Sequence, residues 1–372
     1  MNVKVFSSDK NWIESSAIDQ LNKTAQLEGV LKAAAMPDLH CGKEAPIGAV
    51  FATDSHIYPH LVDTDIGCGI AMWQLSLNHT DTSTDKLDRK LGLNLEGPWP
   101  GNIDEFMKDS NLTRTSFDES SLGTIGYGNH FAELTRLKKI FNAQRFEQLD
   151  LDPKSLFLLI HSGSRGLGES ILTAHHSRFG KAGLAVDSAE SQNYLQQHDH
   201  AVRWARLNRR LIAQRIMEAL NTSGKLIIDL THNHVVPKVI DNKTVWLHRK
   251  GAVPTDDGAA LIAGSRGTLS YMVEASGDQT DNLFSAAHGA GRKWRRSDCK
   301  SRLERKYTAA SLSKTELGGR VICEDKNLLY EEAPQAYKNI DVVIQDLVDY
   351  GLINTIASFA PLLTYKRRQI EK

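Results

Sequence analysis

The stretch at residues 65–69, Asp-Ile-Gly-Cys-Gly, combines two groups that bind transition metals. Asp65 stands three positions before Cys68, and a glycine lies on each side of the cysteine. Because glycine permits sharp or left-handed backbone, such a loop can bring the carboxylate and the thiol to one point. A thiolate and a carboxylate at one point suit a transition metal, whereas the competing interpretation is a buried cysteine in a tight turn.

Four histidines lie in similar surroundings, beside glycine, serine or asparagine: His130, His161, His232 and His288. We predict each of them at a strand end or in a glycine turn, where loops gather side chains at a cleft and expose N–H groups to anions. For any one of them, a structural role is the simpler interpretation. Four together, beside the loop of Asp65 and Cys68, favour one shared site.

The ligand types indicate two metal ions rather than one. Asp65, Cys68, His130, His161 and His232 are more ligands than one tetrahedral zinc with an open position needs. One of the five is a thiolate, which can bridge two metals. Imidazole, carboxylate and thiolate suit Mn, Fe, Co or Zn, and the spacing does not choose among them. Two-metal sites are common in phosphoryl transfer, where they bind the attacking and leaving oxygens.

His288 differs from the other histidines because Gly-Ala-Gly (residues 289–291) and Arg292 follow it. A histidine in an anion-attracting loop can act as a covalent nucleophile toward phosphorus. The alternatives are a fifth histidine ligand and a hydrogen-bond donor to phosphate. The basic run from Arg292 to Lys306 suits a nucleic-acid backbone, and equally a solvated helix face.

The composition is that of a soluble folded protein without a global charge field. The chain has 372 residues, of which 45 are basic, 45 acidic and 41% hydrophobic. With a formal net charge of zero, any nucleic-acid site must be a local patch. We find neither an apolar run long enough for a membrane span nor a signal-peptide core. The four cysteines lack disulfide spacing, so we expect reduced thiols and a cytoplasmic protein.

Apolar runs and helical periodicity predict the elements that position these residues. Strands are expected at residues 47–52, 70–75, 156–160 and 226–230. Helices are expected at residues 84–91, 201–220 and 340–357. The arginines of the second helix should lie mostly on its exposed surface: Arg203, Arg206, Arg209 and Arg210. Strands and helices do not alternate regularly, so we predict an α+β fold. We expect one compact domain over residues 1–372, with mixed and antiparallel sheets around a central cleft and a mobile segment around 85–120.

The motifs, taken in order, resemble the RtcB family of RNA ligases from residue 36 to the C-terminus, with loose stretches around 77–120 and 170–200. The early motifs are Pro-Ile-Gly-Ala-Val (46–50), Asp-Ile-Gly-Cys-Gly (65–69), Gly-Asn-His-Phe-Ala-Glu (128–133) and His-Ser-Gly-Ser-Arg-Gly (161–166). The later motifs are His-Asn (232–233), His-Arg-Lys-Gly-Ala (248–252), the Gly/Ser loop at 264–268, His-Gly-Ala-Gly-Arg (288–292), and the tail stretches 332–338 and 361–366.

The resemblance implies a reaction. RNA ending in a 2′,3′-cyclic phosphate or a 3′-phosphate would be joined to RNA with a 5′-hydroxyl, using GTP and manganese, in RNA repair or tRNA splicing. Cys68 would bridge two Mn²⁺ ions, one also held by Asp65 and His130, the other by His161 and His232.

The remaining roles follow from the same resemblance. His288 would attack the α-phosphate of GTP and carry GMP through a P–N bond. Arg165 and Arg292 would contact RNA or guanylate phosphates. The nucleotide-binding positions would be Asn129, Glu133, Ser265, Ser270, Gly289, Ala290, Gly291 and Lys366.

Two other functions use the same residues. One is a two-metal phosphoesterase without guanylylation, and the other is a non-catalytic RNA-binding component of a repair complex. The chain departs from the family pattern at Tyr127, His234, Ala263, Arg266 and the basic residues 293–296, which bears on substrate choice. Cys41 is expected near the site without binding metal.

Overall fold

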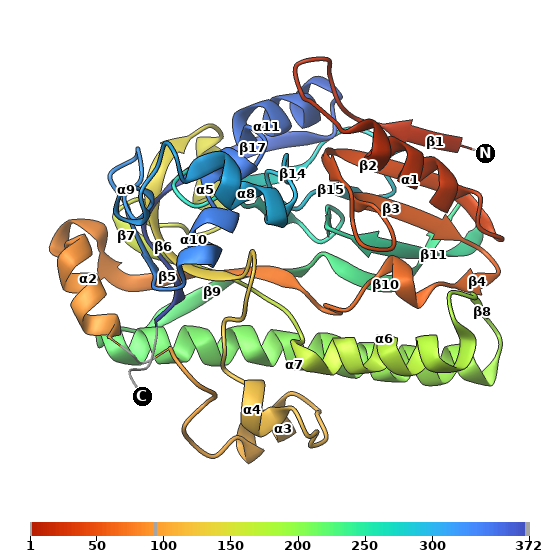
Figure 1. Cartoon of the computed structure of the whole chain (residues 1–372), viewed down its shortest axis with the longest axis horizontal. Helices are drawn as coiled ribbons and strands as arrows, with labels where there is room; N and C mark the ends of the chain where they lie inside the picture. Colours follow the sequence, from red (N-terminus) through yellow and green to blue (C-terminus); the bar gives the residue numbers. More distant parts are fainter. Residues whose placement is uncertain (1, 93–94, 369–372) are drawn as a thin grey trace.

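The computed structural model describes residues 2–92 and 95–368 (Figure 1). Within these ranges eight strands form the larger sheet, in the order β13-β14-β17-β6-β7-β5-β9 with β16 beside β17. Among the described strand pairs of this larger sheet, β16–β17 is parallel and the others are antiparallel. The bounds are β5 (Gly69–Asn78), β6 (Phe131–Ile140), β7 (Ser155–Ser162), β9 (Gly224–Thr231), β13 (Ala259–Ile262), β14 (Ser270–Ala275), β16 (Arg320–Cys323) and β17 (Ile353–Arg367).

A second sheet lies beside the first and has the order β1-β2-β3-β11-β10. Its strands are β1 (Asn2–Val5), β2 (Val30–His40), β3 (Ile47–Thr53), β10 (Asn233–Ile240) and β11 (Lys243–Lys250). Since β9 ends at Thr231 and β10 begins at Asn233, His232 is the residue at which the chain passes from one sheet to the other. Two short pairs complete the strands: β12 (Ala252–Pro254) with β15 (Ser285–Ala287), and β4 (His56–Ile57) with β8 (Leu184–Ala185).

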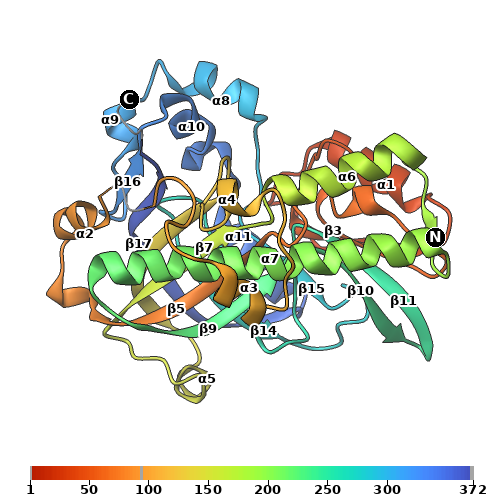
Figure 2. The same ribbon diagram turned by 90° about the horizontal axis from the view of Figure 1, so that it is seen from below.

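One long helix, α7 (Ala189–Leu220), runs along both sheets, as the two ribbon views show (Figures 1 and 2). It begins where the Ser188 side chain accepts from the N–H of Ser191 and ends at Asn221, which is left-handed. α6 (Gly166–Phe179) packs beside it. The other helices are α1 (Ser15–Ala25), α2 (Thr84–Leu91), α3 (Asp104–Asp109), α4 (Asp118–Ser121), α5 (Ala143–Gln148), α8 (Arg296–Leu303), α9 (Ala309–Leu312), α10 (Lys326–Glu331) and α11 (Ile340–Asp349).

The alternation of side chains along the central strands determines which residues face the site. In β7, Leu156, Leu158 and Ile160 pack with the apolar face of α7, while Phe157 and Leu159 pack on the opposite face of the sheet. Side chains of a strand alternate between the two faces, so the side chain of His161 lies on the same face as those of Phe157 and Leu159. The same alternation in four other strands places four more side chains on that face, within a strand or at its end: Cys68, His232, Glu133 and Lys366.

The buried Arg209 joins α7 to the strand ends beneath it. Its guanidinium donates to the carbonyl oxygens of Gly67 (2.9 Å) and Ser162 (2.8 Å), and to Asp229 Oδ1 (2.8 Å). Gly67 has φ +78°, and a Cβ there would lie 2.8 Å from that of Ala205. The expectation that Arg209 is exposed is therefore wrong, because the close approach of the Gly67 loop to α7 encloses its side chain.

The α+β prediction is confirmed, and the four expected strands correspond to β3, β5, β7 and β9. The helix expected at 201–220 begins earlier, at Ala189. The helix expected at 340–357 is confirmed over 340–349 but is wrong beyond that, because α11 ends at Asp349, Gly351 adopts φ +69°, and β17 begins at Ile353. In the segment 85–120, α2, α3 and α4 are formed, while residues 93–94 lie outside the described residues. Of the described helices, none has the length and apolarity that a membrane span requires.

Candidate active site

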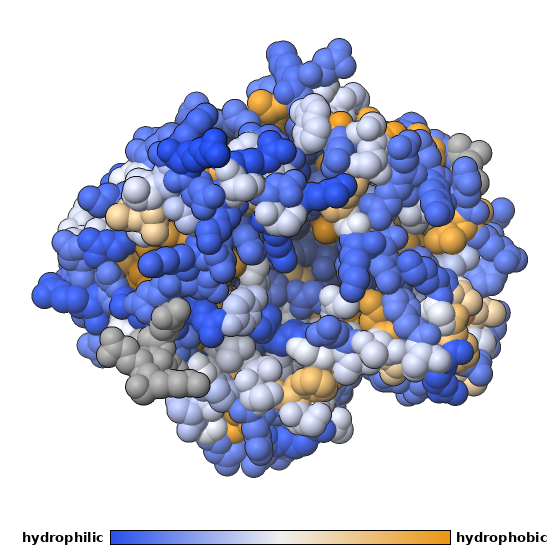
Figure 3. Space-filling view, in the orientation of Figure 1, coloured by the Kyte–Doolittle hydropathy of each residue, from blue (hydrophilic) through white to orange (hydrophobic). Residues whose placement is uncertain are grey.

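A cavity of about 980 Å³ receives side chains from both sheets. The face shown in Figure 3 is hollowed near its centre, and mostly hydrophilic residues surround the hollow. All predicted site residues except Ser270 line the cavity. Ser270 is buried, and its hydroxyl accepts from the N–H of Gly264 at 3.1 Å, so it holds the loop that carries Ser265.

Strand register brings the predicted metal ligands together. Cys68 directly precedes β5, whose Gly69 pairs with Ser162 of β7 on one side and with Thr231 of β9 on the other. This pairing places the neighbours of those two residues, His161 and His232, beside Cys68. On the far side of β7, Phe131 of β6 pairs with His161, which brings His130 to the same place.

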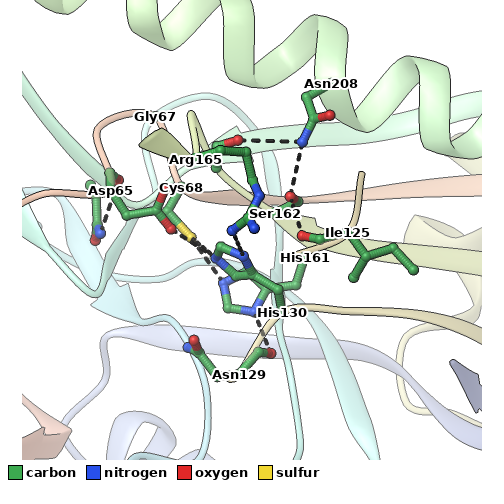
Figure 4. A network of polar contacts seen from close by, with 12 residues as sticks. Asp65, Gly67, Cys68, Ile125, Asn129, His130, His161, Ser162, Arg165 and Asn208 are labelled. Carbon is green, nitrogen blue, oxygen red and sulfur yellow. Dashed lines mark hydrogen bonds and ion pairs between the residues drawn. The ribbon is translucent and has the colours of Figure 1, made fainter. Parts of the chain in front are cut away.

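The ligand atoms converge on a small buried volume (Figure 4). Cys68 Sγ lies 3.3 Å from His130 Nε2 and 3.2 Å from His161 Nε2. His161 Nε2 lies 3.2 Å from His232 Nε2, and Asp65 Oδ2 lies 2.8 Å from His130 Nε2. The cysteine is thus in the middle, with Asp65 and His130 on one side and the other two histidines on the other side.

The charges of this cluster suit a bound cation. Burial lowers the pKa of His161 and His232 well below the ordinary value, so both rings are neutral, as metal ligands must be. Burial, together with the charge of Asp65, raises the pKa of the Cys68 thiol well above its ordinary value. Burial would also raise the pKa of Asp65, but His130, together with Arg165 and Cys68, lowers that pKa to about 2.

One hydrogen bond fixes the orientation of a ligand. His161 Nδ1 lies 3.2 Å from the carbonyl oxygen of Asn129, to which it donates, so Nε2 keeps its lone pair for the cluster. Two neutral imidazoles, a carboxylate and a thiol in direct contact fit a transition metal, which would take the thiol as thiolate. Cys41 does not join them, since its Sγ lies 3.0 Å from the hydroxyl of Ser16.

His288 is held by Asp38, a fully buried residue of β2 that had no predicted role. Asp38 Oδ2 accepts from His288 Nδ1 at 2.7 Å and from the His288 backbone N–H at 3.2 Å. In the neutral ring the proton therefore lies on Nδ1, and Nε2 has the free lone pair. The His288 ring packs edge-on against that of His232, with 4.9 Å between centroids. Gly291, at φ +72°, passes so close to Asp38 that a Cβ would lie 2.3 Å from its carbonyl oxygen.

A second group of polar residues lies further along the cavity. Glu133 of β6 and Thr364 of β17 are paired in register, and the Thr364 hydroxyl donates to the carboxylate. Lys366 donates to the carbonyl oxygen of Gly128 at 2.9 Å and lies 3.6 Å from Glu332 Oε2. Tyr337 also donates to Glu332. Glu332 and Tyr337 had been recognised only as part of a tail motif.

The two predicted phosphate-binding arginines differ in their surroundings. Arg165 has φ +57°, its Nη1 lies 3.5 Å from His130 Nδ1, and its buried Nε has no partner among the described residues. Arg292 donates to Glu332 Oε1 (3.0 Å), the Tyr337 hydroxyl (3.1 Å) and the Glu331 carbonyl oxygen (2.7 Å). Arg165 thus keeps donor capacity for a phosphate, while Arg292 is engaged in internal contacts.

Glu133 predicts a pH dependence of stability. Burial raises its pKa to about 7, against the opposing effects of Thr364 and Lys366. The stabilisation is complete below the unfolded pKa and is lost as pH rises through 7, because the unfolded chain then releases this proton more easily. Between pH 5 and 8, without metal or nucleotide, the unfolding free energy of the wild type should fall by about 2 kcal/mol relative to Glu133→Gln.

Chemical denaturation at several pH values measures this difference. The control is Glu147→Gln on the exposed face of α5, whose stability should follow the wild type at every pH. Parallel pH profiles for the wild type and Glu133→Gln would contradict the raised pKa.

Comparison with known proteins agrees with the geometry. The family model described as tRNA-splicing ligase RtcB matches residues 20–119 and 100–367. RNA-splicing ligase RtcB2 of Escherichia coli is 45% identical over 371 residues, covering 98% of this chain and 95% of that protein. tRNA-splicing ligase RtcB of Methanococcus maripaludis is 28% identical over 443 residues, covering 94% and 91%. RNA-splicing ligase RtcB of Mycobacterium tuberculosis is 28% identical over 429 residues, covering 92% and 99%. With a family model that spans nearly the whole chain and ligand side chains that meet in one cavity, the chain belongs to the RtcB family.

Proposed function

We propose that this protein is a GTP- and manganese-dependent RNA ligase that joins 3′-phosphate or 2′,3′-cyclic phosphate ends to 5′-hydroxyl ends. The observation that carries the proposal is the arrangement of His288, with Nδ1 bound to Asp38 and the ring against His232 of the ligand cluster. A histidine nucleophile held in one tautomer, beside side chains that could hold metal ions, suits nucleotidyl transfer to histidine. The names of the relatives, which are RNA-splicing ligases, support the same reaction class.

In each proposed transfer one bond to phosphorus forms and another breaks. His288 Nε2 attacks the α-phosphorus of GTP, a P–N bond forms, and the bond to the β-phosphate breaks with release of pyrophosphate. A 3′-phosphate oxygen of the RNA then attacks the same phosphorus, which breaks the P–N bond and leaves the RNA end capped with GMP. Finally the 5′-hydroxyl attacks the 3′-phosphate, its proton goes to solvent, and GMP leaves. A cyclic phosphate is first opened by water.

The protein's own groups orient each participant. Asp38 keeps the proton on Nδ1 of His288 and stabilises the positive charge that develops when Nε2 bonds to phosphorus. Arg165 offers its free donors to a phosphate, and Glu133 and Lys366 offer an acceptor and a donor to the nucleotide. Two Mn²⁺ ions held by Asp65, Cys68, His130, His161 and His232 would neutralise the crowded phosphates and supply Lewis acidity. We further propose that the protein acts in the cytoplasm, on broken RNA or spliced tRNA.

The test is incubation of the wild type with Mn²⁺ and GTP labelled in the α-phosphate. We expect an acid-labile label on the protein, which transfers to RNA bearing a 3′-phosphate and disappears as RNA with a 5′-hydroxyl is sealed. If the protein acquires label from α-labelled GTP but none from γ-labelled GTP, the group transferred is GMP. Metal-loaded protein that opens cyclic phosphates without acquiring label would instead identify the two-metal phosphoesterase. Guanylylation without sealing of any RNA pair would favour the non-catalytic repair component.

A further inference from the structure

Arg266 is a buried cation in the wall of the cavity whose hydrogen-bonding capacity is largely unused. It lies in the Gly-Ser-Arg-Gly turn at residues 264–267, is 5% exposed, and lines the cavity. Its Nη2 donates to the carbonyl oxygen of Leu329. Within the described ranges, its Nε and Nη1 are buried without a hydrogen-bond partner, and no ion pair involves it.

This arrangement is costly for the protein without a ligand. A buried charge needs partners, and an unsatisfied buried donor destabilises the folded state. Arg215, another buried arginine, shows the usual solution, because it donates to the carbonyl oxygens of Glu96, Gly97 and Gly123. Burial lowers the pKa of Arg266 to about 10, which still leaves it charged at neutral pH. Destabilising features of this kind are often retained where they serve binding.

Neither the loop nor the nearby carboxylate satisfies the guanidinium. Gly267 has φ +82°, and a Cβ there would lie 2.7 Å from Thr315, so the turn is fixed against the segment that follows α9. Glu332, the carboxylate whose charge Arg266 senses, is already bound by Arg292 and Tyr337 and approached by Lys366. This wall therefore carries an excess of donors and positive charge over acceptors.

Glu133 supplies a hydrogen-bond acceptor instead of a donor, and its carboxylate lies near Lys366. The cavity thus offers donors at Arg266 and Lys366 and an acceptor at Glu133. Guanine has the matching pattern, with acceptors at O6 and N7 and donors at N1 and N2. Adenine carries an amino donor in place of O6, and an arginine paired with O6 or N7 of guanine discriminates strongly between the two bases.

We propose that Arg266 is a specificity-determining residue that donates to O6 of the guanine base and so selects GTP over ATP. This inference rests on the proposed function, since it concerns the nucleotide that reacts with His288. A contact between Arg266 and a phosphate would instead affect every nucleoside triphosphate alike.

The experiment compares the wild type with Arg266→Met, a substitution that removes the donors and keeps an unbranched side chain. Protein labelling and thermal stabilisation are measured with GTP, ATP and 2-aminopurine riboside triphosphate, which lacks O6. We expect the wild type to prefer GTP. In Arg266→Met the KM for GTP should rise about tenfold while values for the other two nucleotides stay the same, so that the preference largely disappears.

Arg215→Met is the matched control, because it removes a buried arginine whose Nη1 and Nη2 are engaged away from the cavity. It should lower the Tm of the nucleotide-free protein and leave the nucleotide preference unchanged, whereas Arg266→Met should not lower that Tm. Equal losses for all three nucleotides in Arg266→Met, or an unchanged preference, would overturn the proposal. If the wild type binds GTP in preference to ATP but acquires no label, the proposed function fails, and the stabilisation ratios still decide the role of Arg266.

Discussion

His288→Ala is expected to acquire no GMP label and to seal no RNA, while it binds Mn²⁺ as the wild type does. The substitution removes the Nε2 lone pair that would bond to phosphorus and leaves the ligand side chains in place. The measurements are acid-labile labelling with α-labelled GTP and Mn²⁺ content after gel filtration. Label on His288→Ala would show that another residue carries the nucleotide.

Asp38→Asn distinguishes the nucleophile from the residue that positions it. Asparagine can turn its amide N–H₂ toward Nδ1, which moves the ring proton to Nε2 and blocks the attack. Disrupting the equivalent carboxylate–histidine pair in serine proteases costs about 10⁴-fold in rate. We expect the labelling rate of Asp38→Asn to fall by about 10²-fold or more, with residual labelling that His288→Ala lacks. A rate equal to that of the wild type would remove Asp38 from the mechanism.

Cys68→Ala is expected to lose most of the Mn²⁺ from both positions, whereas Asp65→Ala should retain the ion held by Cys68, His161 and His232. The physical reason is position, because Cys68 Sγ contacts both His130 (3.3 Å) and His161 (3.2 Å). Asp65 interacts with His130 and with Cys68 itself. A thiolate between two cations is shared, so its removal weakens both sites.

Metal content per chain at a series of Mn²⁺ concentrations separates the two variants. Cys41→Ala is the control, because Cys41 lines the same cavity but its thiol contacts Ser16. It should bind as much Mn²⁺ as the wild type. Equal Mn²⁺ content in Cys68→Ala and Asp65→Ala would contradict the bridging role of Cys68.

The sequence was sufficient to place His161 and His232 near one another, because each lies at the end of a strand with a clear local signal. The apolar run before His161 is β7, and the run before His232 is β9, so both side chains were predicted at strand ends. The residues that support them were harder to predict. Asp38 lies in a mostly apolar strand, and its partner His288 is 250 positions away, so no local pattern connects them.

Two errors have the same origin, since local periodicity does not reveal tertiary contacts. Arg209 follows the polar pattern of an exposed helix face, yet Asp229 and two carbonyl groups from distant segments enclose it. Residues 340–357 contain enough apolar side chains for a helix, but the left-handed Gly351 ends it, and pairing with β6 and β14 makes the following residues a strand.

The place of β17 in the larger sheet has a consequence for synthesis on the ribosome. This strand is the last one among the described residues, yet it lies between β14 and β6, which pair with it and not with each other. Until residues 353–367 have been translated, β6 and β14 each present an unpaired edge, and such edges favour aggregation of nascent chains. The same residues bring Lys366 to the cavity. A nascent chain that has not yet inserted β17 therefore lacks Lys366 in the cavity, and under the proposed function we expect it not to react with GTP.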